Sequence, residues 1–87
     1  MSLILAFTDE GWQDYQHWVA KDRAVLKRVN ALIEATLRDP EEGIGKPERL
    51  RANLAGFWSR RITDEHRLVY TVVDAKYLVI VQVRYHY

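Results

Sequence analysis

The sequence contains no cysteine, and this absence excludes disulfide bonds, thiol nucleophiles and zinc sites built on cysteine. Long apolar runs are also missing. Residues 1–7 are mostly apolar but too few for a signal peptide, and no other run approaches the roughly 18 residues of a membrane-spanning helix. We therefore expect a soluble, cytoplasmic protein with no membrane partner.

Glycine and proline are sparse, at four and two residues, and half of them fall in the segment 41–47, EEGIGKP. This segment is predicted to be a loop that can move or cover a site. The 87 residues show no repeat, linker or low-complexity stretch. We expect one domain spanning residues 1–87, with one sheet and a helical layer.

The formal net charge is only +1, but the charge is unevenly distributed. Residues 1–43 carry five basic and eight acidic side chains, whereas residues 44–87 carry eight basic and four acidic ones, giving −3 and +4. A basic half of this kind would attract a polyanion. Ordinary solvated surface charge explains the same distribution about as well.

The N-terminal segment 3–7 is predicted to be a strand inside the sheet, buried on both faces. Thr8 or Asp9 can cap the helix that follows. Large apolar side chains recur there at three- and four-residue spacing, at Trp12, Tyr15, Trp18 and Val19. Packing in the core explains these residues better than stacking on nucleic-acid bases.

Asp22 can cap a second helix, which Pro40 ends. Its predicted buried stripe consists of Val25, Val29, Leu32, Ile33 and Leu37. The link between the two helices is so short that they must form an antiparallel hairpin, packed on one face of a sheet.

Extended segments are predicted at 48–51, 57–63, 67–73 and 76–87, with turns at 53–56 and 74–75. The last is the longest predicted strand. Alternation predicts that two apolar sets face the helices: Leu68, Tyr70 and Val72, and Tyr77, Val79, Val81, Val83 and Tyr85. The opposite face would then carry Arg67, Gln82, Arg84 and His86; the pattern leaves open whether Arg61 joins them.

Four cationic or titratable side chains lie close together in the segment 53–70: Arg60, Arg61, His66 and Arg67. Arginine suits a phosphodiester because its planar guanidinium donates two parallel hydrogen bonds and stays charged at physiological pH. These residues therefore indicate a site that handles phosphate.

Cleavage of RNA through its own 2′-hydroxyl needs a base, a cation and an acid. Glu48, Arg67 with Arg61, and His86 could supply these roles, and the two terminal tyrosines could stack on a base. No metal or other cofactor is expected, because the three histidines lack ligand spacing and no carboxylates cluster. The alternative is structural, with Glu48 paired to Arg51 at the surface and His86 at a frayed chain end.

Three separated motifs resemble one protein family. They are GKPERL at 45–50, GFWSRRITDEHRLVY at 56–70 and RYHY at 84–87, and the spacing of Trp12, Tyr15 and Trp18 agrees as well. Over essentially its full length the sequence resembles the YoeB (Txe) branch of the RelE/ParE toxin superfamily. The resemblance implies an α+β, RelE-like fold: an N-terminal strand and an antiparallel helix hairpin packed on one face of a mostly antiparallel, twisted sheet.

The resemblance also implies a function: a type II toxin that cleaves mRNA in the A site of the 70S ribosome and is neutralised by a YefM-like antitoxin. It places the general base at Glu48, the phosphate-binding arginine at Arg67, the general acid at His86 and an orienting tyrosine at Tyr87. The expected RNA-binding residues are Lys46, Arg51, Arg60 and Arg61, with Arg51 standing where the family often has lysine. Homodimerisation is compatible with the resemblance.

Two other function classes use the same fold. One is a ParE-like inhibitor of DNA gyrase that cleaves nothing, and the other is an inert domain that binds RNA or an antitoxin. The presence of Glu48, Arg67, His86 and Tyr87 together favours the nuclease.

Overall fold

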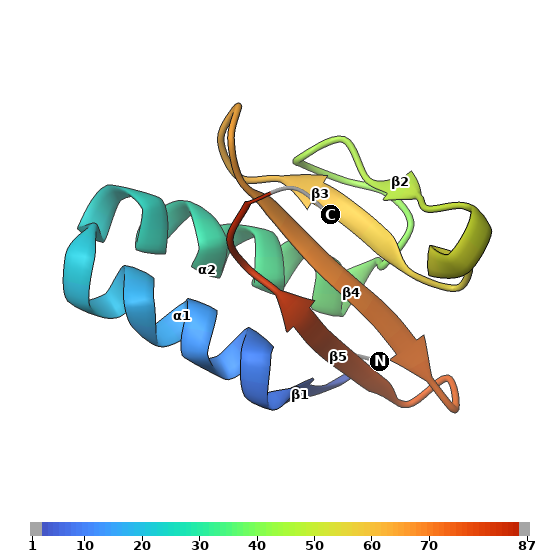
Figure 1. Ribbon diagram of the computed structural model, residues 1–87. Coiled ribbons are helices and arrows are strands. Elements are labelled where there is room, and N and C mark those ends of the chain that lie inside the picture. Colours follow the sequence, from blue (N-terminus) through green and yellow to red (C-terminus); the bar gives the residue numbers. More distant parts are fainter. Residues whose placement is uncertain (1–2, 86–87) are drawn as a thin grey trace.

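The computed structural model describes residues 3–85. Its elements are β1 (Ile4–Phe7), α1 (Asp9–Lys21), α2 (Arg23–Arg38), β2 (Glu48–Arg49), the short 3₁₀ helix η1 (Ala52–Leu54), β3 (Trp58–Arg61), β4 (Arg67–Val73) and β5 (Tyr77–Gln82). The strands form one sheet in the order β1-β5-β4-β3-β2, in which only the β1–β5 pair is parallel. The two helices cover one face of it (Figure 1). The predicted α+β fold with a helix hairpin is confirmed.

Short polar residues set the limits of the two helices. The side chain of Thr8 accepts a hydrogen bond from the backbone N–H of Gly11 at 3.1 Å and so caps α1. Asp22 ends α1 through its own backbone N–H and caps α2 with its carboxylate, which accepts from two backbone N–H groups. One residue therefore joins the helices, and this forces the antiparallel hairpin.

The core lies between α2 and the inner face of the sheet. It consists mainly of Val29, Leu32, Ile33, Leu68, Tyr70, Leu78 and Ile80. The predicted stripe of α2 is confirmed, with Val25 and Leu37 half-buried at its ends. In α1, by contrast, Trp18 is buried, whereas Trp12 and Val19 are about half exposed.

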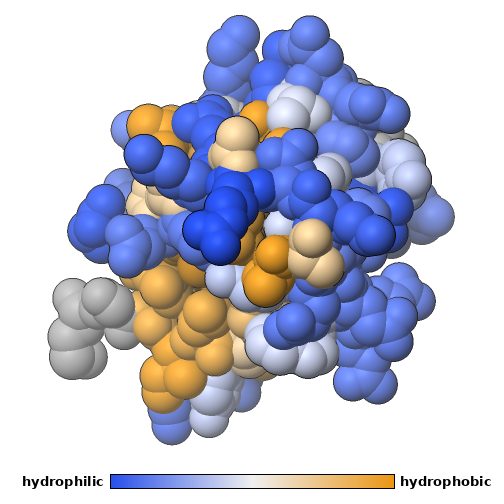
Figure 2. Space-filling view, turned by 90° about the vertical axis from the view of Figure 1, so that its left-hand side faces the viewer, coloured by the Kyte–Doolittle hydropathy of each residue, from blue (hydrophilic) through white to orange (hydrophobic). Residues whose placement is uncertain are grey.

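The prediction that Trp12 lies in the core is therefore wrong. Its ring stacks on Tyr15, with centroids 5.9 Å apart, and meets the edge of Phe7 at 5.4 Å. These aromatic rings line an open apolar groove between β1, α1 and α2. Seen from the side of the molecule where the helix hairpin lies, apolar surface remains exposed to solvent (Figure 2).

The prediction for the N-terminal strand is also wrong in part. β1 is a strand, but it lies at the edge of the sheet, and Ile4 and Leu5 are 51% and 40% exposed. The reason is topological: β4 already occupies one side of β5, so β1 can pair only along the other side.

The predicted faces of β5 are reversed over most of the strand. Tyr70 pairs with Ile80 and Val72 with Leu78, so the even-numbered residues face the helices. Val69 then pairs with Gln82, which leaves Val81 as an extra residue in a β-bulge. Because the bulge reverses the alternation, Gln82 joins the outer face. β5 also ends at Gln82, well short of the predicted strand 76–87.

Candidate active site

The strand register gathers polar side chains on the face of the sheet that lies away from the helices. Residues directly paired across antiparallel strands point to the same face. Glu48 pairs with Ser59, Ser59 with Val69, and Val69 with Gln82, so one row crosses four strands. Arg61 and Arg67 pair with each other in the next such row. Arg61, whose face the sequence left open, therefore shares the face of Arg67.

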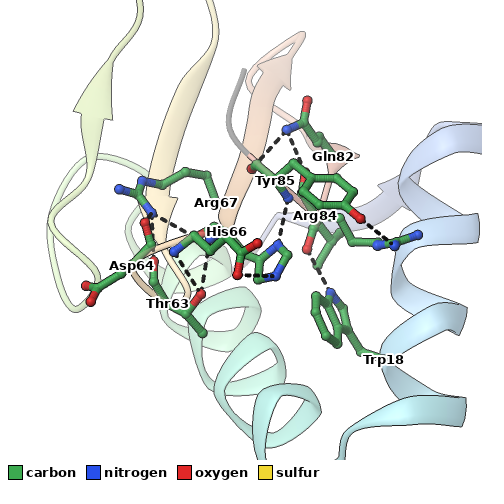
Figure 3. Close-up of polar contacts among 10 residues, drawn as sticks. Trp18, Thr63, Asp64, His66, Arg67, Gln82, Arg84 and Tyr85 are labelled. Carbon is green, nitrogen blue, oxygen red and sulfur yellow. Dashed lines mark hydrogen bonds and ion pairs between the residues drawn. The ribbon is translucent and has the colours of Figure 1, made fainter.

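Arg67 is held in a defined orientation. Its Nη1 donates to the backbone carbonyl oxygens of Thr63 at 2.7 Å, His66 at 3.0 Å and Asp64 at 3.3 Å (Figure 3). The hydrogen bonds that residues 3–85 provide to this side chain all end on Nη1. No hydrogen bond to a described residue occupies its Nη2 or Nε, so these atoms can donate to an anion from a guanidinium that is already oriented.

Arg61 is more loosely held. Its side chain is 48% exposed, and its Nη1 lies 3.9 Å from a carboxylate oxygen of Asp64. An exposed pair of this kind contributes little and leaves the side chain mobile. Two guanidinium groups directly across a strand pair repel each other, and a phosphate between them would relieve that repulsion.

Glu48 is exposed at the start of β2, directly after the loop 39–47. β2 and β4 are separated by β3, so Glu48 lies roughly 10 Å from the β4 backbone at normal strand spacing. A scissile nucleotide could span that distance, with its sugar near the carboxylate and its phosphate near the arginines.

Arg60 is fully buried, so the prediction that it contacts RNA is wrong. Its Nη1 donates to Ile44 O at 3.0 Å, and its Nη2 donates to Asp39 O at 2.6 Å and Glu42 O at 3.0 Å. Arg60 occupies an even-numbered position of β3, and the even-numbered side chains of this strand face the helices. It therefore anchors the loop that leads into Glu48.

Lys46 and Arg51 are exposed on either side of Glu48. Lys46 follows Gly45, whose carbonyl oxygen accepts a hydrogen bond from the backbone N–H of Arg61 at 2.7 Å. This bond brings the loop alongside the arginine pair. Contact of Lys46 and Arg51 with RNA stays a prediction.

His86 and Tyr87 lie outside the described residues. The segment just before them is well defined, because the backbone N–H of Arg67 donates to Tyr85 O at 3.1 Å. The structure thus brings Tyr85 next to the residue predicted to bind phosphate. The predicted acid is the next residue in the sequence.

His66 does not lie with the phosphate-binding cations, as its sequence context had indicated. Its Nδ1 accepts a hydrogen bond from the backbone N–H of Tyr85 at 2.8 Å, and its ring packs against Trp18 (Figure 3). No sequence pattern reveals this contact, because it joins residues that are 19 positions apart. Within residues 3–85, no three His, Cys, Asp or Glu side chains gather as metal ligands would.

Comparison of this chain with known proteins identifies its family. A family model described as a YoeB-like toxin of a bacterial type II toxin-antitoxin system matches residues 7–87. The chain belongs to the YoeB toxin family. Toxin YoeB of Streptomyces coelicolor is 58% identical over 83 residues, which cover 95% of this chain and 98% of that relative.

Solved YoeB structures share the fold. The YoeB/ParE toxin from Agrobacterium tumefaciens superposes with a TM-score of 0.93 at 42% identity, covering 98% of this chain and 100% of that one. Staphylococcus aureus YoeB has been solved as a dimer and in a YoeB-YefM complex, with TM-scores of 0.89 and 0.87, identities of 42% and 41%, and complete coverage of both chains. These matches confirm the RelE-like fold of this YoeB family member. No helix in the described part of the chain is long and apolar enough to cross a membrane.

Proposed function

We propose that this YoeB family member is a ribosome-dependent endoribonuclease that cleaves translated mRNA at the ribosomal A site. The observation that carries the proposal is the strand register. It puts the exposed carboxylate of Glu48 and the paired guanidinium groups of Arg61 and Arg67 on one face, beside the segment that leads to His86.

In this mechanism the carboxylate of Glu48 removes the proton from the 2′-hydroxyl of the nucleotide before the cut. The 2′-oxygen attacks phosphorus while the bond from phosphorus to the 5′-oxygen breaks. Arg67, supported by Arg61, stabilises the charge that develops on the phosphate oxygens. His86 donates a proton to the departing 5′-oxygen, and Tyr87 orients the scissile nucleotide. The upstream fragment is left with a cyclic phosphodiester.

The proposed partners are the 70S ribosome with its mRNA and a YefM-like antitoxin, and the site of action is the cytoplasm. The complex of Staphylococcus aureus YoeB with YefM supports the antitoxin, and its dimer supports self-association. An acidic antitoxin segment lying along the basic outer face would deny that face to RNA. We further propose that residues 1–87 act as one domain.

Primer extension on a reporter message in a reconstituted translation system tests the nuclease proposal. The variants are Glu48→Ala, Arg67→Ala and His86→Gln. Arg23→Ala serves as the matched control, because Arg23 is an exposed arginine at the start of α2. We expect cuts at A-site codons that fall by at least roughly 100-fold in the three site variants and persist in the control, with antitoxin binding retained throughout.

The fold by itself also accommodates an inhibitor of DNA gyrase, and the Agrobacterium tumefaciens relative carries both names, YoeB and ParE. Intact message together with blocked DNA supercoiling would assign the protein to that class. Full activity of the Glu48 and His86 variants would instead remove these two residues from the mechanism.

A further inference from the structure

His66 has contacts that the proposed chemistry leaves unexplained. It lies between β3 and β4, directly before Arg67, and only 13% of its side chain is exposed. Its ring lies between those of Trp18 and Tyr85, with centroids 4.8 and 5.3 Å away. Figure 3 shows the imidazole directed toward Tyr85.

The hydrogen bond from the backbone N–H of Tyr85 to Nδ1 of His66 is 2.8 Å long. A ring nitrogen that accepts a hydrogen bond carries no proton, so this contact requires a neutral imidazole with its proton on Nε2. The carbonyl oxygen of Tyr85 accepts from the backbone N–H of Arg67. His66 and Arg67, which are adjacent at the start of β4, therefore hold both backbone polar groups of Tyr85.

Tyr85 has a φ of +59°. Residues other than glycine rarely adopt this backbone conformation, and it needs support from its surroundings. The regular ladder of β5 has already ended at Gln82. The indole N–H of Trp18 donates to Val83 O at 2.8 Å, and the side-chain amide of Gln82 donates to Arg84 O at 2.7 Å. Among the described side chains, His66 alone accepts from the Tyr85 N–H.

We propose that His66 is a positioning residue: it accepts the backbone N–H of Tyr85 and thereby sets the direction in which the chain continues into His86 and Tyr87. The inference rests on the proposed function, because it concerns the acid and the tyrosine assigned there. A displacement of about 1 Å in a reacting group can reduce a rate on the order of 100-fold. A residue that touches no substrate can therefore govern the cleavage rate.

Two substitutions distinguish the role of His66 as a hydrogen-bond acceptor from its role in packing against Trp18. His66→Leu keeps an apolar group against Trp18 and removes the acceptor, whereas His66→Asn puts an amide oxygen near the position of Nδ1. His17→Leu is the matched control, since the ring of His17 also meets Trp18 at 4.8 Å. In the reconstituted translation assay we expect His66→Leu to lower the maximal cleavage rate by roughly 10- to 100-fold. The ribosome concentration for half-maximal rate should not change, and the other two variants should cut at close to the wild-type rate.

Equal rates for wild type and His66→Leu would overturn the proposal. So would equal losses in the leucine and asparagine variants when both are folded, because the acceptor would then not be the important feature.

Hydrogen exchange at the Tyr85 amide of the full chain, followed by NMR, gives a second readout that does not depend on activity. Slow exchange is expected in wild type and His66→Asn, and fast exchange in His66→Leu. Wild-type exchange as fast as that of an unprotected amide would overturn the proposal even if the leucine variant fails to fold. If wild type cuts no mRNA, the proposed function fails, whereas the exchange pattern still decides whether His66 holds Tyr85.

Discussion

Arg60 is a buried cation whose hydrogen-bond partners among the described residues are all neutral groups. Three backbone carbonyl oxygens accept from its guanidinium, and its Nε donates to the phenol oxygen of Tyr70 at 3.1 Å. The phenol in turn donates to Pro40 O at 2.6 Å. Arg60 and Tyr70 together hold the loop 39–47 against the sheet, and this loop delivers Glu48 to the outer face.

Burial raises the pKa of the Tyr70 phenol above its ordinary value of 10.0, and the nearby Arg60 opposes part of that rise. In the unfolded chain the phenol loses its proton near its ordinary pKa of about 10. In the folded protein it keeps the proton to a higher pH. The stabilisation that Tyr70 provides is therefore complete below about pH 10 and is lost as the pH rises through the folded pKa.

We expect Tyr70→Phe to lower the free energy of unfolding by about 1–3 kcal/mol at about pH 7, because Arg60 and Pro40 each lose a hydrogen-bond partner. The difference from wild type should hold steady to about pH 9 and shrink above about pH 10. Urea denaturation of both proteins across this range measures it, and all other titrating groups cancel because both chains carry them. A difference that stays constant to about pH 11 would contradict the role of the buried phenol.

At the scale of elements, the bulge in β5 decides what the outer face contains. In a regular ladder Val81 would pair with Val69, and Gln82 would point toward the helices. Because Val81 is bulged instead, Gln82 points outward, and its side-chain amide donates to the carbonyl oxygens of Arg84 and Tyr85 and holds the segment after the strand. The bulge therefore links the end of β5 to the backbone contact between Arg67 and Tyr85.

The loop 39–47 depends on glycine at position 45. Gly45 has a φ of +87°, and a Cβ placed there would lie 2.6 Å from Cδ2 of Leu32 and 3.1 Å from Cβ of Arg60. Gly56 has a similar φ of +95°, but a Cβ there would meet nothing within 4 Å. Substituting each glycine by alanine therefore separates backbone strain from crowding.

We expect Gly56→Ala to destabilise the fold by roughly 1 kcal/mol through its backbone conformation alone. Gly45→Ala should cost a further 1–3 kcal/mol or so, because Leu32 and the loop must move apart. Thermal unfolding and urea denaturation of the two variants measure the difference. Equal losses of stability in the two variants would show that Leu32 can move away from a Cβ at position 45 at no measurable cost.

At the scale of the whole molecule, the two halves of the charge distribution become two layers. The acidic half, residues 1–43, includes both helices, and the basic half, residues 44–87, includes strands β2 to β5. The surplus of positive charge thus belongs to the sheet side, where Arg61 and Arg67 lie. A polyanion would be drawn to the outer face rather than to the helices.

Salt dependence tests this arrangement. We expect Arg61→Gln to weaken binding of a single-stranded 2′-O-methyl RNA, which cannot be cut. The slope of log affinity against log salt should fall by about 0.7, as expected for one phosphate contact to a single strand. Arg23→Gln, on the helix side, should leave affinity and slope unchanged. Fluorescence anisotropy from about 50 to 200 mM salt measures both, and an equal effect of the two substitutions would contradict a role for the outer face.

Much of the architecture could be predicted from the sequence, because local interactions set it. Thr8 and Asp22 cap helices with their own side chains, and the period of the α2 stripe predicts a buried face whatever surrounds it. The limits of β4 agree with the predicted segment 67–73. The motifs around Glu48 and Arg67 identify the family, since they preserve residue types and spacing along the chain.

The tertiary structure alone decided the features that depend on partners far apart in sequence. The alternation of apolar and polar residues in the sequence cannot reveal the bulge at Val81. The period of two is regular before and after the inserted residue, and nothing in the sequence marks where it shifts. Arg60 and Arg61 are chemically identical, and only the loop 39–47 and Tyr70, which pack around Arg60, make one a buried anchor and leave the other a surface cation. The pairing of His66 with Tyr85 arises where the β3–β4 loop meets the end of β5, and a contact between distant segments leaves no signal in either one.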